Sequence, residues 1–369
     1  MFIRIASLVK KEFLALFSDK RSRFVVIVPP LLQLIVFSYA ATFDLNHVPL
    51  AIYDEDGGPA ARELIARIEG SNIFEEVARL TSKDQVASLI EKRAVLVLVH
   101  IGASFSGHLA RGDGGPVQVI VDGRNSNTAM TALNYVRSIV TQFNLDWARA
   151  RNQPGPPAQL LVRAWFNPNL ESRWFIVTGI VGLITLLVTL LVTALSVARE
   201  REQGTFDQLL VTPLRPVEIL IGKAMPGILI GLFESSLIIA VAVLWFRIPL
   251  IGSLLSLYIG ILLFLMSAVG FGLLISSLAV TQQQGMLGAF LFMVPSVILS
   301  GFATPIANMP EAVQNLTLIN PMRYFMIILR GVFLEGTPMS LLIPQYWPLA
   351  LIGIITLSFA AWLFRHRLY

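Results

Sequence analysis

Between two long apolar runs the sequence reads Arg199-Glu-Arg-Glu-Gln-Gly-Thr-Phe-Asp-Gln-Leu-Leu-Val-Thr-Pro-Leu-Arg-Pro-Val-Glu-Ile-Leu-Ile-Gly-Lys223. This stretch, residues 199–223, is short, charged and rich in turn-forming residues. The runs on either side, 174–198 and 224–246, each have the length of about 20 residues that crosses a bilayer as a helix. A segment between two such runs is expected at a membrane face, where a membrane protein meets soluble partners.

The composition agrees with a membrane protein. Hydrophobic residues make up 55% of the 369 residues and charged residues only 14%, whereas soluble domains carry about 25% charged residues. The chain is therefore predicted to be an α-helical polytopic membrane protein. Its lack of cysteine excludes disulfides, thiolate catalysis and zinc–thiolate sites. The net charge of +5 is interpreted as a topology signal, and no nucleic-acid partner is expected.

The N-terminal part is expected to hold two helices. Residues 1–23 alternate apolar and basic positions at helical spacing, which predicts an amphipathic helix in the cytoplasmic interface. Residues 24–43 carry no charge and predict the first membrane span. Pro29 and Pro30, near its start, are expected to delay or kink the helix. A cleaved signal peptide is the alternative, but the apolar run and the basic segment before it are long for one.

Residues 44–173 carry charges throughout and predict a soluble domain inserted between the first two spans. Three β-branched segments read as strands and three amphipathic segments as helices, which together suggest a small α/β unit. A proline-rich stretch at 153–157 is expected to be a linker. The expected strands are 48–53, 94–99 and 117–121, and the expected helices are 59–69, 82–92 and 128–149.

The remaining residues, 174–369, are predicted to form transmembrane helices two to six, which gives six spans in all. Residues 305–338 contain three prolines and fit a re-entrant or interfacial hairpin better than a full span. The five spans expected in this part are 174–198, 224–246, 254–280, 285–304 and 346–364.

Lysine and arginine in the short loops set the orientation. The segments 1–23, 198–223 and 365–369 are rich in these residues, so both termini and the loop 199–223 are predicted to be cytoplasmic. Long translocated domains do not obey this rule. The domain 44–173 is therefore predicted to be extracytoplasmic.

By its own pattern the loop 199–223 has two interpretations. Residues 206–211 can form a short helix, which Pro213 and Pro216 end, and such a protrusion fits a groove on a soluble partner. A plain solvated loop with balanced charge explains the same pattern. On the pattern alone, the plain solvated loop is the better explanation.

Four ordered motifs resemble those of ABC-2 type transporter permeases, and most closely the group linked to multidrug efflux. The resemblance covers the whole chain, including the domain after the first span. The motifs are Glu200-Arg-Glu-Gln-Gly-Thr205 with Leu209-Leu-Val-Thr-Pro213, Phe166-Asn-Pro-Asn-Leu170, Ser300-Gly-Phe-Ala-Thr-Pro305, and Asn320-Pro-Met-Arg-Tyr-Phe325.

The resemblance implies a permease subunit of an ATP-binding-cassette exporter in the bacterial inner membrane, working on hydrophobic or amphipathic, drug-like or lipid-like substrates. It implies a partner ATPase dimer, which holds the ATP and Mg, and a second permease subunit, identical or related. The loop then corresponds to the coupling helix that the ATPase contacts. The residues that match this motif are Glu200, Arg201, Glu202, Gly204, Thr205, Leu209, Leu210 and Pro213. The size and position of the 44–173 domain suggest a periplasmic adaptor as a further partner.

The chain itself has no Gly-rich phosphate loop, since Gly222-Lys223 is followed by Ala and lacks an upstream glycine at the required spacing. We therefore expect a transport permease and not an enzyme, with no cofactor bound by this chain. Its four histidines are scattered and suggest no metal site.

Three charged residues are candidates for the substrate path. Glu234 is an acid inside a span, where a carboxylate is expensive and is by default a functional candidate. Arg323 and Arg330 lie in the hairpin. The structural alternatives are a Glu234 carboxylate satisfied by Ser235, Ser236 or Arg330, and arginines paired with Glu311 or Glu335.

Two other classes of membrane protein compete with the exporter. A receptor or sensor with an extracytoplasmic ligand-binding domain needs a cytoplasmic output module, and only short segments are predicted on that side. A secondary transporter should show inverted repeats or several intramembrane charges. The sequence shows neither.

Overall fold

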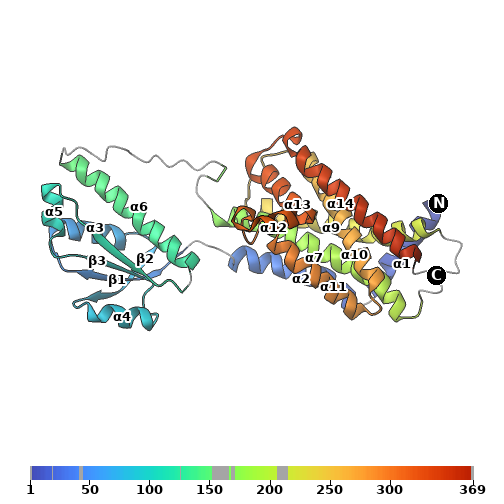
Figure 1. Ribbon diagram of the computed structural model, residues 1–369, viewed down its shortest axis with the longest axis horizontal. Helices are drawn as coiled ribbons and strands as arrows, with labels where there is room; N and C mark the ends of the chain where they lie inside the picture. Colours follow the sequence, from blue (N-terminus) through green and yellow to red (C-terminus); the bar gives the residue numbers. More distant parts are fainter. Residues whose placement is uncertain are drawn as a thin grey trace. The chain divides into compact units, whose positions relative to one another are not determined.

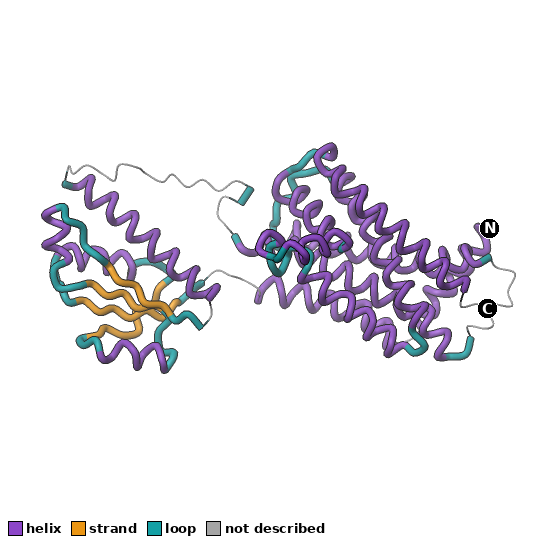
Figure 2. The backbone as a smooth tube through the Cα atoms, in the orientation of Figure 1, coloured by secondary structure: helices purple, strands orange, loops and turns teal. Residues whose placement is uncertain are grey.

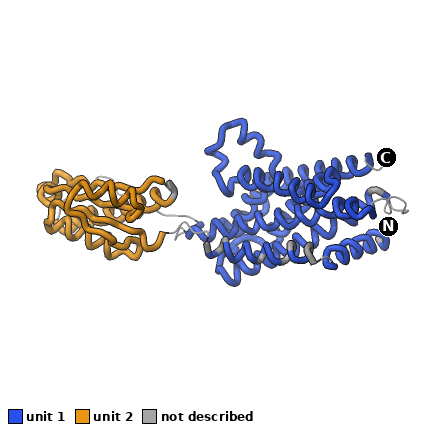
Figure 3. Tube along the Cα trace, turned by 90° about the horizontal axis from the view of Figure 1, so that it is seen from below, with its two compact units in different colours: residues 1–41, 164–369 blue, residues 42–163 orange. Residues whose placement is uncertain are grey.

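The structure is a computed structural model that describes residues 2–18, 20–40, 45–124, 126–151, 166–167, 171–205 and 215–366. The chain divides into two compact units (Figure 3). Met1–Ala41 and Ala164–Tyr369 form the first, here called the helical unit, and Thr42–Arg163 form the second, here called the α/β unit. The linker predicted at 153–157 lies outside the described residues.

The α/β unit contains a four-stranded sheet of order β2-β1-β3-β4 (Figure 2). Strand β1 pairs in parallel with both β2 and β3, and β4 is antiparallel to β3. The strands are β1 (Val48–Asp54), β2 (Phe74–Leu80), β3 (Val97–Ile101) and β4 (Val117–Val121). The helices are α3 (Pro59–Glu69), α4 (Asp84–Glu91), α5 (Phe105–Arg111) and α6 (Ser126–Ala150).

Both faces of the central strands are buried. Leu50 and Ile52 of β1 contribute to an apolar cluster with α3, α5 and α6, whereas Ala51 and Tyr53 join a second cluster with residues of α4. This alternation follows from the two-residue period of a strand. Strand β2 was not expected, because its sequence Phe-Glu-Glu-Val-Ala-Arg-Leu is polar. It lies at the edge of the sheet, where its middle residues stay exposed.

The described residues of the helical unit form seven longer helices (Figure 1). Between the last two of them the chain forms shorter turns. The longer helices are α1 (Phe2–Ser18), α2 (Lys20–Ala40), α7 (Ser172–Glu202), α9 (Pro216–Leu244), α10 (Leu254–Leu278), α11 (Gln282–Ile298) and α14 (Met339–His366). The shorter elements are η1 (Ile306–Asn308), α12 (Glu311–Leu316), η2 (Thr317–Ile319), α13 (Pro321–Arg330) and the π-helical turn η3 (Gly331–Glu335).

Helix α7 is the centre of this unit. It packs against α2, α9, α10, α11 and α13, and it is buried along most of its length. Small residues allow the close approach of its neighbours. A Cβ atom at Gly227 of α9 or at Gly272 of α10 would overlap the side chain of Thr193.

Four helices of the described chain, α7, α9, α10 and α14, are long and apolar enough to cross a membrane. The segments Glu311–Ile319 and Pro321–Glu335 would count as a fifth span if taken together, but they meet at an angle of 85°. That bend is typical of a broken span or a re-entrant loop. The chain is therefore a polytopic membrane protein, and the number of six spans stays a prediction.

Helices α9 and α14 begin earlier than expected, at Pro216 and Met339, and helices α2 and α11 also differ from the expected bounds. Helix α2 begins at Lys20 and continues through Pro29 and Pro30. Each proline removes one intrahelical bond, which packing within a helical bundle tolerates. Helix α11 ends at Ile298 instead of reaching residue 304. The chain turns there, with Gly301 in a left-handed conformation at φ +80°.

Candidate functional site

The end of α7 carries the described part of the expected coupling motif. Helix α7 stops in a Schellman motif, in which Thr205 N–H donates to Glu200 O (2.9 Å) and Gly204 N–H to Arg201 O (3.1 Å). Gly204 has φ +67°, a conformation that suits glycine. The motif therefore fixes where the helix stops and the loop begins. Three other expected residues, Leu209, Leu210 and Pro213, lie outside the described residues.

A buried cluster of opposite charges joins three helices at this end of the unit. Lys223 of α9 has a side chain only 1% exposed, and its Nζ lies 2.6 Å from Glu200 Oε2 of α7 and 3.1 Å from Glu12 Oε1 of α1. Lys11 pairs with the other oxygen of Glu200. Two positive and two negative side chains thus balance, which compensates for their removal from water. We call Lys11, Glu12, Glu200 and Lys223 the ion cluster.

Apolar contacts hold α1 at the same place. Leu8 of α1 forms a buried cluster with Val197 of α7, Ile219 of α9 and Phe364 of α14. Helix α9 approaches closely here, because a Cβ atom at Gly222 would lie 2.7 Å from Leu8 Cγ. Helices α7, α9 and α14 therefore all contact α1 at this place.

Of the ion cluster, only Glu200 was a candidate from the sequence, where it was expected to contact the ATPase; the structure places it against Lys11 and Lys223. One signal was present: Glu12 is an acid in a segment otherwise dominated by basic residues, and Lys223 is a cation at the start of an apolar run. Recognising Glu12 and Lys223 as an ion pair required knowing that α1 folds onto the ends of α7 and α9.

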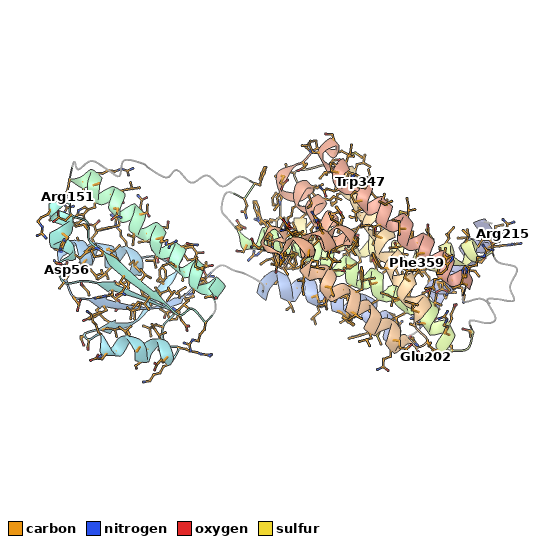
Figure 4. All side chains as sticks on the ribbon, in the orientation of Figure 1. Asp56, Arg151, Glu202, Arg215, Trp347 and Phe359 are labelled. Atoms are coloured by element: carbon orange, nitrogen blue, oxygen red, sulfur yellow. The ribbon has the colours of Figure 1, made fainter. Side chains whose placement is uncertain are left out.

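Arg201 and Glu202 contact the turn between α10 and α11. The Arg201 guanidinium donates to Ser277 O (2.8 Å) and Ala279 O (3.2 Å) at the end of α10. Glu202 Oε2 accepts a hydrogen bond of 2.7 Å from the backbone N–H of Gln282, the first residue of α11. Each charge suits the helix dipole that it faces. Glu202 is labelled at this end of the helical unit in Figure 4.

The three candidates for the substrate path do not form one group. Glu234 is 7% exposed, and its Oε2 has no hydrogen-bond partner within the described part of the chain. The two serines proposed as its partners donate instead to backbone carbonyls of Gly231 and Leu232. A buried carboxylate oxygen without a donor among the described residues therefore lies on helix α9.

The two arginines bind carbonyl and hydroxyl oxygens. Arg330 donates to Gly301 O (3.3 Å), and its guanidinium carbon lies 4.3 Å from the centroid of the Phe175 ring. Arg323 donates to Thr317 Oγ1 and to Gln314 O (3.3 Å). Arg323 thus connects segments of the hairpin, whereas Arg330 connects the hairpin to the turn after α11 and to Phe175 of α7. Among the described residues, neither arginine forms a hydrogen bond with the two glutamates considered from the sequence.

Two asparagine motifs have local structural roles. Asn320 Oδ1 caps α13 by accepting from Met322 N–H (3.1 Å), and Pro321 occupies the first helical position. Asn167 exchanges two hydrogen bonds of 3.0 Å with the backbone of Glu171, just before α7. The conformations of these turns explain the residue types in the motifs.

The α/β unit has its own polar cluster. Glu55 accepts from the Tyr53 hydroxyl (2.7 Å) and contacts His100 Nε2 (2.9 Å), and His100 Nδ1 lies 3.1 Å from Gln118 Oε1. The Tyr53 hydrogen bond, followed by that of His100, lowers the pKa of Glu55. The described residues contain no cluster of three or more His, Asp and Glu able to hold a metal ion.

Comparison with known proteins gives the family. Residues 20–362 match the sequence profile of the ABC-2 family transporter protein. The chain belongs to the ABC-2 transporter family. This ABC-2 protein is 40% identical over 367 residues to the probable multidrug ABC transporter permease YbhR of Escherichia coli K12, covering all of both chains. It is 33% identical over 339 residues to the permease YbhS of the same strain, covering 90% of this chain and 89% of YbhS.

A third relative is the inner membrane transport permease YhhJ of Escherichia coli K12. It is 29% identical over 367 residues, which cover 96% of this ABC-2 protein and 95% of YhhJ. All three relatives are permeases that match nearly the full chain. The resemblance inferred from four motifs is thereby confirmed, and the protein is an ABC-2 permease.

Proposed function

We propose that this chain is the permease subunit of an ABC exporter that moves hydrophobic or amphipathic, drug-like or lipid-like substrates out across the inner membrane. The main structural support for the proposal is the ion cluster, because it binds α7 and α9, the helices on either side of the loop 199–223, to each other and to α1. The names of the relatives, two multidrug permeases and one inner membrane permease, support the substrate class and the location.

The energy comes from a separate ATPase dimer that binds ATP and Mg, and this chain contributes the loop that the ATPase contacts. A push on the loop moves α7 and α9 together, since Lys223 of α9 is bound to Glu200 of α7. Helix α7 lies at the centre of the helical unit. A displacement of α7 is therefore transmitted to most of the other helices.

The rest of the proposed assembly follows the sequence analysis. Two permease subunits, identical or related, enclose the path, and each has six spans with both termini in the cytoplasm. The α/β unit lies outside the cytoplasm and meets a periplasmic adaptor. Protease protection of the α/β unit in inside-out vesicles tests this topology, and its digestion there would contradict it.

The coupling role is tested by capture of the ATPase. We expect Gly204→Pro to reduce co-purification of the partner ATPase, because proline cannot adopt φ +67° and removes the N–H that ends α7. The expected reduction is about ten-fold or more, since 1.4 kcal/mol corresponds to a factor of ten. Co-purification from membranes, followed by the rate of ATP hydrolysis, measures it.

Gly204→Asn is the matched control, since asparagine tolerates the left-handed conformation better than other residues do. Among the described residues, no atom outside the neighbouring backbone lies within 4 Å of the position that its Cβ would take. Capture of no ATPase by the unaltered chain would contradict the proposed function, as would full capture and stimulation by Gly204→Pro.

We also propose that Glu234, Arg323 and Arg330 lie along the substrate path, with Glu234 contacting cationic groups. Glu234→Gln removes the charge at nearly constant shape. We expect efflux of an amine-bearing fluorescent dye to fall about ten-fold, as for a lost charged hydrogen bond, with ATPase capture retained. Glu311→Gln, at an exposed acid, is the control. Unchanged efflux in Glu234→Gln would remove the substrate role.

A further inference from the structure

The turn between α10 and α11 is bound to the last turn of α7 through two adjacent side chains of opposite charge. Arg201 holds the carbonyl end of α10, and Glu202 accepts the first N–H of α11. Helix ends leave such carbonyl and N–H groups unsatisfied unless a side chain or water binds them. A cation at the C-terminal end and an anion at the N-terminal end are also the favourable signs for the two helix dipoles.

We propose that Arg201 and Glu202 are positioning residues, which transmit movement of the loop to α11 by holding the α10–α11 turn on α7. This inference rests on the proposed function, because it assumes that the ATPase moves the loop. It assigns these two motif residues a different role from contact with the ATPase. Their charged groups are engaged within the permease itself.

The packing of α11 indicates that this helix follows the movement of α7. A Cβ atom at Gly285 would lie 2.8 Å from Ala194 O, so the first turns of α11 press directly on α7. On the side of α10, a groove of about 460 Å³ opens between the two helices, lined by Ile275, Leu278, Leu291 and Phe292 among others. Helix α11 also packs on α10 at Gly288 and Phe292, but it contacts α7 along more of its length.

The hydrogen bond from Gln282 N–H to Glu202 can be removed by changing either the donor or the acceptor. Glu202→Ala deletes the acceptor. Gln282→Pro deletes the donor, and proline is well accepted at the first position of a helix. The residue before it, Thr281, has φ −121° and ψ 157°, which is the extended conformation that proline requires of its predecessor. Gln282→Ala keeps the N–H and is the matched control.

The absence of cysteine from the chain allows a direct readout. A spin label on Leu287→Cys, at a 69% exposed position of α11, reports on α11, and a label on Phe233→Cys, 72% exposed, reports on α9. The purified complex with its ATPase is compared with and without ATP and vanadate. We expect both labels to respond in the otherwise unaltered protein.

In Gln282→Pro and in Glu202→Ala we expect the response at Leu287 to fall about ten-fold, which corresponds to one charge-assisted hydrogen bond. In Gln282→Pro the response at Phe233 and the capture of the ATPase should stay within two-fold. The response at Leu287 in the double variant should be no smaller than in either single variant. Gln282→Ala should respond normally at both positions.

Three outcomes would overturn the inference. A normal Leu287 response in Gln282→Pro would show that packing alone moves α11. Loss of ATPase capture in Glu202→Ala but not in Gln282→Pro would place Glu202 at the ATPase. Additive losses of the Leu287 response in the double variant would show that the Glu202 carboxylate and the Gln282 N–H act independently. Failure of the proposed function looks different, since neither label would then respond in the otherwise unaltered protein.

Discussion

Replacing Lys223 with methionine should destabilise the helical unit by about 3–5 kcal/mol, as expected when one partner of a buried ion pair is removed. Methionine has a similar volume but removes the buried cation that contacts both Glu200 and Glu12. Lys11 also pairs with Glu200 and lies 3.8 Å from Glu12, but one cation leaves one of the two carboxylates uncompensated. The temperature of half-unfolding of the detergent-purified protein measures the effect.

Lys10→Met is the matched control, since Lys10 is exposed on the same end of the molecule and should change stability by less than about 0.5 kcal/mol. A second variant combines Lys223→Met with Glu12→Gln and Glu200→Gln. It removes the buried charges together and should recover part of the loss. A Lys223→Met protein as stable as Lys10→Met would disprove the structural role of the ion cluster.

Replacing Gly222 with leucine should detach α1 from α9. Even a Cβ atom at this position would lie 3.0 Å from Leu8 Cβ and closer to the outer atoms of Leu8, so a larger side chain cannot fit beneath α1. Overpacking of this kind costs about 1–3 kcal/mol. We expect trypsin to cut within α1 faster in Gly222→Leu than in the unaltered protein, as followed by mass spectrometry.

A paired change distinguishes local displacement from general misfolding. Gly222→Ala should show a smaller effect of the same kind, and adding Leu8→Ala should relieve it, because the overlapping atoms of Leu8 are then gone. Gly107→Ala, in the α/β unit where the nearest atom is 3.7 Å away, serves as the control for a harmless added methyl group. No rescue by Leu8→Ala would contradict the proposed contact.

Long apolar runs and ordered motifs made the membrane class and the family predictable. Helices α7, α9 and α10 fall close to three of the expected spans, because their sequences are long apolar runs, and α9 tolerates Pro226 in its interior. The strand β2 was missed, since its polar residues reflect an edge position that only the sheet order reveals. The local sequence pattern thus predicted the elements themselves better than it predicted which elements lie beside one another.

The candidate site was predictable only in part. The motif located the end of α7, and Gly204 takes the left-handed turn that its residue type favours. The partners of that motif lie far along the chain, Glu202 with Gln282 and Glu200 with Lys11 and Lys223. A charge in a sequence does not state whether it faces a soluble partner or another helix of the same chain, so these pairings required the structure.

The ion cluster also sets a condition on the synthesis of the protein. Glu12 and Lys223 are 211 residues apart. At about 5–20 residues per second, Glu12 waits roughly 10–40 seconds for its partner to be made. During that time the amphipathic α1 can rest on the membrane surface. We infer that its docking onto the finished helices is a late step, so that nascent chains arrested before residue 223 should leave α1 open to protease.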